Sequence, residues 1–278
     1  MRVAYLGPPG TFSEEAVARC DLAAGGEAVP FPTFAEAYRA LRRGEVDGAL
    51  LPIENSIEGS VGATLDLLVG EHGPLIRREL LLPVRQHLLA PPGRRLEDVV
   101  RVLSHPQPFG QCSRFLQERL PRAALEPTHS TADAARKVAA GEPGAAAIGS
   151  KTAAARYGLA VLAESIQDVD ENVTRFVLLA QADEGPTGAD RTSIAFTLDR
   201  DRPGGLYEVL GEFAGRGINL SKVESRPMKE ALGHYVFFLD FEAHRLDGAA
   251  AEALAGVRSR VHRLYLLGSY PRAVAPAA

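Results

Sequence analysis

Short apolar runs alternate with amphipathic helical patterns over the first 180 residues, and this alternation is the strongest constraint on the fold. Strands are predicted at residues 3–7, 29–31, 48–53, 99–104, 145–149 and 176–180. Between several of them apolar residues recur at spacings of three and four, as in Val61, Leu65 and Leu68. Such alternation is typical of an α/β sheet with helices on both faces.

A polar segment with glycine and proline, residues 181–190, ends this pattern and predicts an interdomain linker. Beyond it, strands are expected at residues 192–199, 218–227, 234–244 and 264–270, with helices at 205–217 and 249–261. This βαββαβ order over residues 191–278 resembles an ACT domain, an amino-acid-sensing module with the ferredoxin-like fold.

Length and charge exclude several classes of protein. A chain of 278 residues fits two domains. A net charge of −4 argues against a nucleic-acid partner, and no apolar run approaches the roughly 20 residues that span a membrane. Because the chain begins directly with a strand-and-turn pattern, we expect no signal peptide and a cytoplasmic location. Cys20 and Cys112 lack metal-ligand spacing and are expected to be reduced thiols.

Hydroxyl-bearing residues stand where strands of the first domain give way to helices. They are Thr11, which forms a capping-box spacing with Glu14, and Ser60, Ser104, Ser130 and Ser150. Ligands of open α/β sheets bind at the carboxyl ends of the strands, and helix N-termini suit anions. As a set these residues predict a site for a small carboxylate-bearing ligand, although each one alone is an ordinary cap.

The stretch LPIENSIEGSVGATLDLL, residues 51–68, places a polar corner directly after an apolar strand. Glu54, Asn55 and Ser56 form the corner, and nearby glycines allow backbone to approach a ligand. Glu54 is either a catalytic carboxylate or a solvated loop residue.

A second polar stretch is SHPQPFGQC, residues 104–112. His105, Gln107 and Gln111 lie at a predicted helix start, the two glutamines one helical turn apart on one face. His105 is either structural or catalytic.

In the stretch DENVTRFVLLA, residues 170–180, polar residues directly precede an apolar strand. In a strand Thr174 and Phe176 share one face and Arg175 points to the other. A hydroxyl beside an aromatic ring suits a flat organic ligand. Arg175 is compatible with a carboxylate clamp and equally with a structural ion pair to Asp170 or Glu171.

These stretches together resemble the monofunctional bacterial prephenate dehydratase family, with a C-terminal ACT regulatory domain. The matching motifs are GPPGTFSEEA (7–16), PIENSIEGSV with Thr64 (52–64), SHPQPFGQC (104–112), NVTRF (172–176) and ESRP (224–227). Each motif alone is weak, but their order and spacing over essentially the whole chain are specific.

The resemblance implies a catalytic domain over residues 1–180 with two lobes, similar to type II periplasmic binding proteins, and an active site in the cleft. One lobe is expected to hold about 1–76 plus 166–180, and the other 77–165. The ACT domain follows the linker at 191–278.

The family reaction converts prephenate to phenylpyruvate with loss of carbon dioxide and water and without a cofactor. The resemblance implies that Thr174 is catalytic and hydrogen-bonds or protonates the leaving hydroxyl, directly or through a relay. Substrate contacts are expected from Asn55, Ser56, Ser60, Thr64, Gln107, Gln111, Arg175 and Phe176, and a proton supply from Glu54 and His105. No metal is expected.

The resemblance also implies feedback inhibition by L-phenylalanine, bound between ACT domains of adjacent subunits in a homo-oligomer, a dimer or a tetramer. The matching residues are Arg202, Pro203, Gly204, Gly205 and Leu206, with Glu224, Ser225, Arg226 and Pro227; Gly205 stands where the family commonly has alanine. Two other functions stay open: arogenate dehydratase, and a non-catalytic sensor of a small acid.

Overall fold

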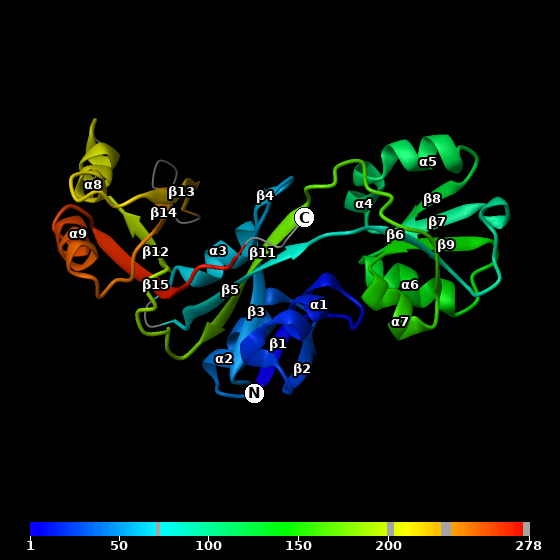
Figure 1. Cartoon of the computed structure of the whole chain (residues 1–278), viewed down its shortest axis with the longest axis horizontal. Coiled ribbons are helices and arrows are strands. Elements are labelled where there is room, and N and C mark those ends of the chain that lie inside the picture. The colour runs from blue at the N-terminus through cyan, green and yellow to red at the C-terminus, as the bar shows by residue number, and fades with distance from the viewer. Residues whose placement is uncertain (71–72, 199–202, 229–234, 275–278) are drawn as a thin grey trace.

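The computed structural model describes residues 1–70, 73–198, 203–228 and 235–274, and these form three sheets with their helices. Figure 1 shows the three units in a row, with the first lobe in the middle, the second lobe at one end and the C-terminal unit at the other.

The first lobe is a mixed sheet with helices on both faces. Its strand order is β2 (Glu27–Phe31), β1 (Arg2–Leu6), β3 (Gly48–Asn55), β11 (Val173–Ala180) and β5 (Leu75–Pro83), with the short β4 (Gly59–Ser60) beside β3. β1, β2 and β3 are parallel, whereas β11 is antiparallel to both of its neighbours. Helices α2 (Phe34–Arg42) and α3 (Gly62–Leu68) pack on one face, and α1 (Phe12–Arg19) packs on the other.

The second lobe repeats this three-layer arrangement. Its strand order is β10 (Ala160–Ala163), β6 (His87–Ala90), β9 (Ala145–Gly149), β7 (Arg101–Ser104) and β8 (Ala124–Pro127). Helices α4 (Pro106–Gln111) and α5 (Ser113–Arg119) adjoin one core, and α6 (Thr131–Ala139) and α7 (Lys151–Tyr157) adjoin the other. The chain passes between the lobes twice, after β5 and before β11.

The C-terminal unit is an antiparallel sheet in the order β13 (Leu220–Pro227), β14 (Tyr235–Phe241), β12 (Asp190–Thr197) and β15 (Arg263–Pro271). Helices α8 (Gly205–Ala214) and α9 (Gly248–Arg258) share one core with this sheet. On its other face Ala195, Phe238 and Leu267 join the core of the first lobe beside Leu65 and Leu68. This shared core attaches the C-terminal unit to the first lobe.

The predicted fold class is confirmed: two α/β lobes are followed by a βαββαβ unit. The six strands predicted in the first part are present, and β9 has the predicted limits. The first lobe extends further than expected, because β5 pairs with β11 as far as Pro83. The sequence of β5 shows only a weak alternation of polar and apolar residues, because charged and apolar residues are mixed along the strand.

The expected helix caps are corrected at two positions. Thr11, Ser130 and Ser150 accept a hydrogen bond from the third residue beyond each of them. Ser60, in contrast, lies in β4, because α3 begins only at Gly62. Ser104 is the last residue of β7 and its hydroxyl donates to the Ile148 carbonyl, so that His105 takes the cap position.

At Gly268 the main chain of β15 lies directly against the main chain of Ile76 in β5 of the first lobe. Its φ is +139°, and a Cβ at this position would lie 2.3 Å from the carbonyl oxygen of Ile76. We expect Gly268→Ala to lower the free energy of unfolding by at least about 2 kcal/mol, because backbone strain and a clash with main chain add. Urea unfolding followed by circular dichroism measures the change.

Gly211→Ala is the matched control, because a Cβ there meets nothing within 4 Å and the residue lies inside α8. Alanine favours a helix over glycine, so this variant should be as stable as the native chain or more so. Equal stabilities of the two variants would contradict a close approach at Gly268.

Candidate active site

A cavity of about 290 Å³ lies between the two lobes. β1 and β3 of the first lobe end there, as does β7 of the second, and carboxyl ends of parallel strands are where ligands of such sheets bind. Because β11 runs antiparallel to β3, it is the beginning of β11 that reaches this edge. The antiparallel direction explains why the polar residues stand at the beginning of this strand, before its apolar part.

The structure brings five of the predicted site residues to this cavity and adds others. The predicted ones are Asn55, His105, Gln107, Gln111 and Thr174. The additional lining residues are Leu6, Phe12, Val84, Gln86, Pro108, His129, Ser130, Thr131 and Asn172. A second hollow of about 620 Å³ shares Leu6, His129 and Ser130 with it and continues along α6.

The hydroxyl of Thr174 is oriented by Asn55. The Asn55 Nδ2 donates to Thr174 Oγ1 at 2.9 Å and to Asn172 Oδ1 at 2.7 Å. The Asn55 Oδ1 accepts from the backbone N–H groups of Ile57 and Glu58, each at 3.0 Å. Backbone donors therefore fix which way the amide faces. Since Thr174 Oγ1 accepts from Asn55, its own hydrogen is left to donate to a ligand.

Side-chain amides continue from Asn55 along the cavity wall. Asn172 Nδ2 lies 3.5 Å and Gln86 Nε2 lies 3.4 Å from Gln111 Oε1. These two contacts are long and therefore weak. The amides thus present hydrogen-bonding groups that a ligand can engage.

The cavity provides few charges of its own. No lysine or arginine is among the residues that line it in the described part of the chain, and the ionisable ones are His105 and His129. Free N–H groups are present at the start of α6, where Ser130 caps the helix and Thr131 lines the cavity. Such N–H groups carry partial positive charge and suit a carboxylate.

Cys112 lies next to Gln111 but is not a nucleophile. The side chain is fully buried, and burial, followed by the charge of Asp168, raises the pKa of the thiol to about 12. A neutral buried thiol is unreactive.

Arg175 points away from the cavity into a buried ionic cluster. Its guanidinium donates to Glu79 at 2.7 Å, to Asp240 at 2.7 Å and to the Tyr270 hydroxyl at 2.8 Å. Glu79 also accepts from Arg191 at 2.6 Å. The expected substrate contact of Arg175 is therefore corrected: of the two alternatives the ion pair holds, with partners other than Asp170 and Glu171.

Glu54 also lies 3.6 Å from the Arg175 guanidinium. The two arginines of this cluster therefore face three carboxylates, and the third of these, Glu54, is also paired with Lys222. Burial by itself lowers the pKa of Arg175, but Tyr270, Asp240 and Glu79 together raise it above its ordinary value. The cluster joins strands β11 and β5 of the first lobe to β12, β14 and β15 of the C-terminal sheet.

Glu54 and Ser60 face the C-terminal unit and do not line the cavity. Glu54 lies on the opposite side of β3 from Asn55 and is 3.5 Å from the ammonium of Lys222. Ser60 donates to Glu224 at 2.5 Å and accepts from Lys222 at 2.8 Å. A proton supply from Glu54 and a substrate contact from Ser60 are not what this arrangement supports.

Three other expected substrate contacts also lie outside the cavity. Ser56 donates to the Glu171 carbonyl and accepts from the Val173 N–H, so it joins β3 to the beginning of β11. Thr64 is fully buried in α3. Phe176 packs in the core beside α1.

The structure describes all but one of the residues that are expected to bind an effector. Arg202 lies outside the described residues. Gly204 adopts a φ of +83° at the start of α8, where Gly205 is the first helical residue. The residues 224–227 form the end of β13, from which Arg226 reaches Asp66 at 3.5 Å.

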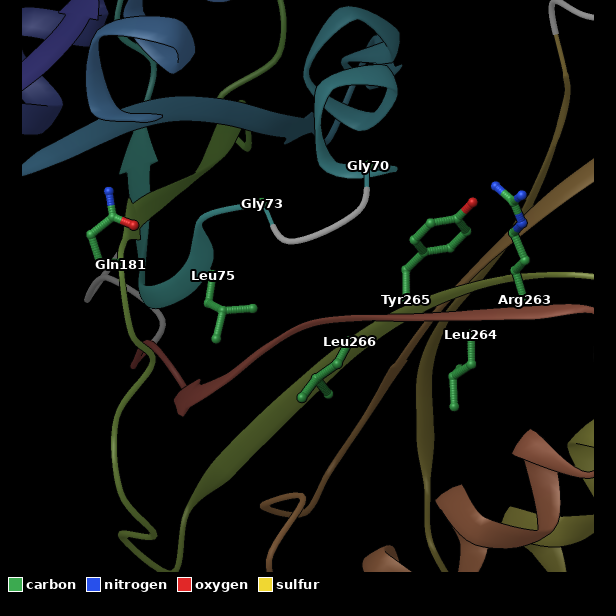
Figure 2. Close-up of a pocket in the computed structure, with 8 residues that line it drawn as sticks. All are labelled: Gly70, Gly73, Leu75, Gln181, Arg263, Leu264, Tyr265 and Leu266. Carbon is green, nitrogen blue, oxygen red and sulfur yellow. The ribbon is translucent and has the colours of Figure 1, made fainter. Parts of the chain in front are cut away.

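A further hollow of about 640 Å³ is lined by residues of the C-terminal strand β15 and of the first lobe and the segment that follows it. Figure 2 shows Arg263 and Tyr265 of β15 pointing to the side of Gly70 and Gly73, whereas Leu264 points away. None of its lining residues belongs to the cavity of Thr174. It is an interdomain space and not part of the candidate active site.

Within the described ranges no three metal-binding side chains cluster. Over the same residues, no helix combines the length and apolarity that crossing a membrane requires.

The sequence analysis named Asn55 and Thr174 in the first lobe and three cavity residues of the second lobe, His105, Gln107 and Gln111, but missed others. Ser130 carried a cap signal, and Asn172 stood inside a quoted motif. Gln86 and His129 carried no signal, because they lie in the crossing after β5 and in the loop after β8, where no periodicity marks a ligand-facing side.

Comparison with known families gives two matches. The profile of prephenate dehydratase matches residues 3–184, and that of the ACT domain matches residues 192–258. The prephenate dehydratase of Amycolatopsis methanolica is 45% identical over 282 residues, which cover 100% of this chain and 90% of the relative.

Solved structures agree in fold over the whole chain. A prephenate dehydratase from Arthrobacter aurescens in complex with L-Phe has a TM-score of 0.91 and 40% identity, covering 99% of this chain and 94% of the other. GqqA, described as a novel type of quorum quenching acylase, has a TM-score of 0.89 and 29% identity, covering 98% of each chain. Because one fold carries both names, function has to be argued from the site.

Breaking the buried cluster should be costly. We expect Arg175→Met to lower the free energy of unfolding by about 3–5 kcal/mol, because Glu79 and Asp240 lose their shared cation while remaining buried. The urea midpoint at neutral pH measures the loss.

Arg101→Met is the control, since Arg101 also binds two carboxylates, Glu126 and Glu142, but at a partly exposed site. Solvent screens such pairs, so the loss there should be clearly smaller. If Arg175→Met proved as stable as Arg101→Met, the cluster would not hold the domains together.

Proposed function

The chain belongs to the prephenate dehydratase family and is a carbon–oxygen lyase; from this premise we propose that its reaction takes place in the interlobe cavity around Thr174. The observation that carries the proposal is the hydrogen bond from Asn55 Nδ2 to Thr174 Oγ1. It leaves the threonine hydrogen as a donor at the edge where the two lobes meet.

The proposed step forms phenylpyruvate from prephenate. The bond from the ring to its carboxylate breaks and releases carbon dioxide, and the electron pair enters the ring. The bond from the ring to the hydroxyl oxygen breaks at the opposite carbon, which makes the ring aromatic. The departing oxygen takes up a proton and leaves as water. Thr174 donates its hydrogen bond to that oxygen as negative charge develops on it.

Orientation of the substrate falls to both lobes. Gln107 and Gln111 extend from α4, and the N–H groups at the start of α6 lie beside Thr131. These neutral donors can receive the two carboxylates and the keto oxygen of prephenate. The imidazoles of His105 and His129 line the same cavity and add ring nitrogens for hydrogen bonds.

Replacement of Thr174 tests the proposal directly. We expect Thr174→Ala to lower kcat for phenylpyruvate formation by about 100- to 10,000-fold, the usual range for losing a group that assists proton transfer. Thr174→Ser keeps a hydroxyl and should retain most of the activity. Phenylpyruvate is measured by its absorbance in alkali, on variants with native circular dichroism.

Three results would change this proposal. Full activity of Thr174→Ala would remove Thr174 from the mechanism. Faster turnover of arogenate than of prephenate by the native chain would identify an arogenate dehydratase. Binding of both acids without turnover of either would favour a sensor.

We further propose that L-phenylalanine inhibits the enzyme through the ACT domain. The support is a contact between the expected effector motif and the active-site strands: Glu224 accepts from Ser60, and Ser60 pairs with Glu54 in the hairpin that continues from Asn55. An effector at β13 would act on this hairpin and, through Asn55, on Thr174.

Ser60→Ala tests that connection. We expect L-phenylalanine to bind this variant, with a dissociation constant measured by calorimetry. The ratio of the half-inhibition concentration to this dissociation constant should rise about fivefold or more. Ser259→Ala, at the end of α9, should leave both quantities unchanged. Parallel changes in binding and inhibition would show that Ser60 does not carry the coupling.

The expected homo-oligomer, a dimer or a tetramer, is part of this proposal. It follows from an effector site shared between ACT domains. Sedimentation with and without L-phenylalanine tests it, and a monomer that L-phenylalanine still inhibits would contradict a shared site.

A further inference from the structure

Gln86 lines the active-site cavity and carries a buried acceptor without a partner. The residue is 2% exposed and lines the cavity together with Thr174. Among the buried side-chain atoms described for the cavity's lining residues, its Oε1 is the one without a hydrogen bond. Buried polar groups are nearly always paired, so an orphaned acceptor on a side chain that lines a cavity indicates a ligand that donates.

The backbone around Gln86 is held firmly. Its N–H donates to Gln167 Oε1 at 3.0 Å, and its carbonyl accepts from the Ile166 N–H at 2.8 Å. These bonds join the two crossings between the lobes. The backbone of Gln86 is therefore fixed beside the cavity, and its rotation cannot satisfy Oε1.

The direction of the Gln86 amide is also determined. Its Nε2 faces Gln111 Oε1, and Gln111 Nε2 in turn faces Glu58 Oε1 at 3.4 Å. Flipping the Gln86 amide would bring two carbonyl oxygens together. Oε1 thus remains the group without a partner.

Prephenate as a dianion has one hydrogen-bond donor, the hydroxyl on its ring, because its carboxylates and keto group only accept. We propose that Gln86 Oε1 accepts the hydrogen of this hydroxyl and so positions the leaving oxygen for Thr174. The inference rests on the function proposed above. It assigns Gln86 as a substrate-contacting residue that recognises the leaving group.

The two contacts are complementary. The substrate hydroxyl donates to Gln86 and accepts from Thr174, whose own oxygen is occupied by Asn55. As the carbon–oxygen bond breaks, the oxygen keeps its hydrogen, gains a second proton that solvent supplies through the Thr174 hydroxyl, and departs as water, so that Thr174 ends the step protonated. Gln86 undergoes no chemical change and serves to orient a lone pair of the oxygen toward the donor.

Phenylpyruvate separates this role from general binding, because the product lacks the ring hydroxyl. We expect Gln86→Met to lower kcat/KM for prephenate by about 10- to 100-fold, the range for losing a hydrogen bond in a buried site. The inhibition constant of phenylpyruvate should change less than about twofold. The melting temperature should not fall, because the variant removes an unsatisfied acceptor.

Gln167→Met is the matched control, since Gln167 is also buried, at the neighbouring crossing, but does not line the cavity. It should lower the melting temperature, because the Gln86 N–H loses its acceptor, and change kcat/KM much less. Gln86→Leu takes the place of Gln86→Met if the latter does not fold.

The assignment is overturned by unchanged kcat/KM in Gln86→Met, or by an equal loss in Gln167→Met. It is also overturned if phenylpyruvate binding weakens in parallel, because Gln86 would then contact a part common to substrate and product. A native chain without prephenate turnover would instead refute the proposed function, so the two failures are distinguishable.

Discussion

The ion pairs of Arg175 with Glu79 and Asp240 hold the molecule together at the point where its domains meet. All three side chains are nearly inaccessible to solvent. Desolvating them is expensive, and only mutual pairing with good geometry compensates. The first lobe and the C-terminal sheet must therefore keep one relative placement for the cluster to remain satisfied, and the shared apolar core beneath β12, β14 and β15 reinforces that placement.

Strand β11 connects this cluster to the chemistry. Thr174 and Arg175 are adjacent and point to opposite sides, one to the interlobe cavity and the other to the domain interface. The pairing of β11 with β3 shifts register between Arg175 and Phe176, and irregularities of this kind commonly redirect a side chain near an active site. A movement of the C-terminal sheet would thus act on β11 one residue away from the proposed donor.

The sequence predicted elements and motifs well where the signal is local. Strand-helix alternation predicted the α/β elements, and the polar residues before β11 drew attention to Thr174, whereas the two lobes and the role of Thr174 were implied by the family resemblance. Contacts between distant segments were not predictable in this way: Arg175 meets Glu79 and Asp240, 96 and 65 residues away, and Ser60 meets Glu224, 164 residues away. Gln86 escaped for the same reason, since only folding brings its crossing beside β11 and α4.

The scarcity of cations in the cavity suits the proposed reaction. A carboxylate that leaves as carbon dioxide loses its charge as the bond breaks, so a tight ion pair would stabilise the bound substrate more than the transition state. Neutral amides and helix N–H groups hold it without that penalty. The leaving oxygen, in contrast, gains negative charge, and a donor fixed beforehand, as Asn55 fixes Thr174, becomes more effective as the charge grows. In the proposed reaction the cavity would therefore favour the transition state through the placement of neutral dipoles, whereas the nearby cations Arg175 and Arg191 form ion pairs at the domain interface.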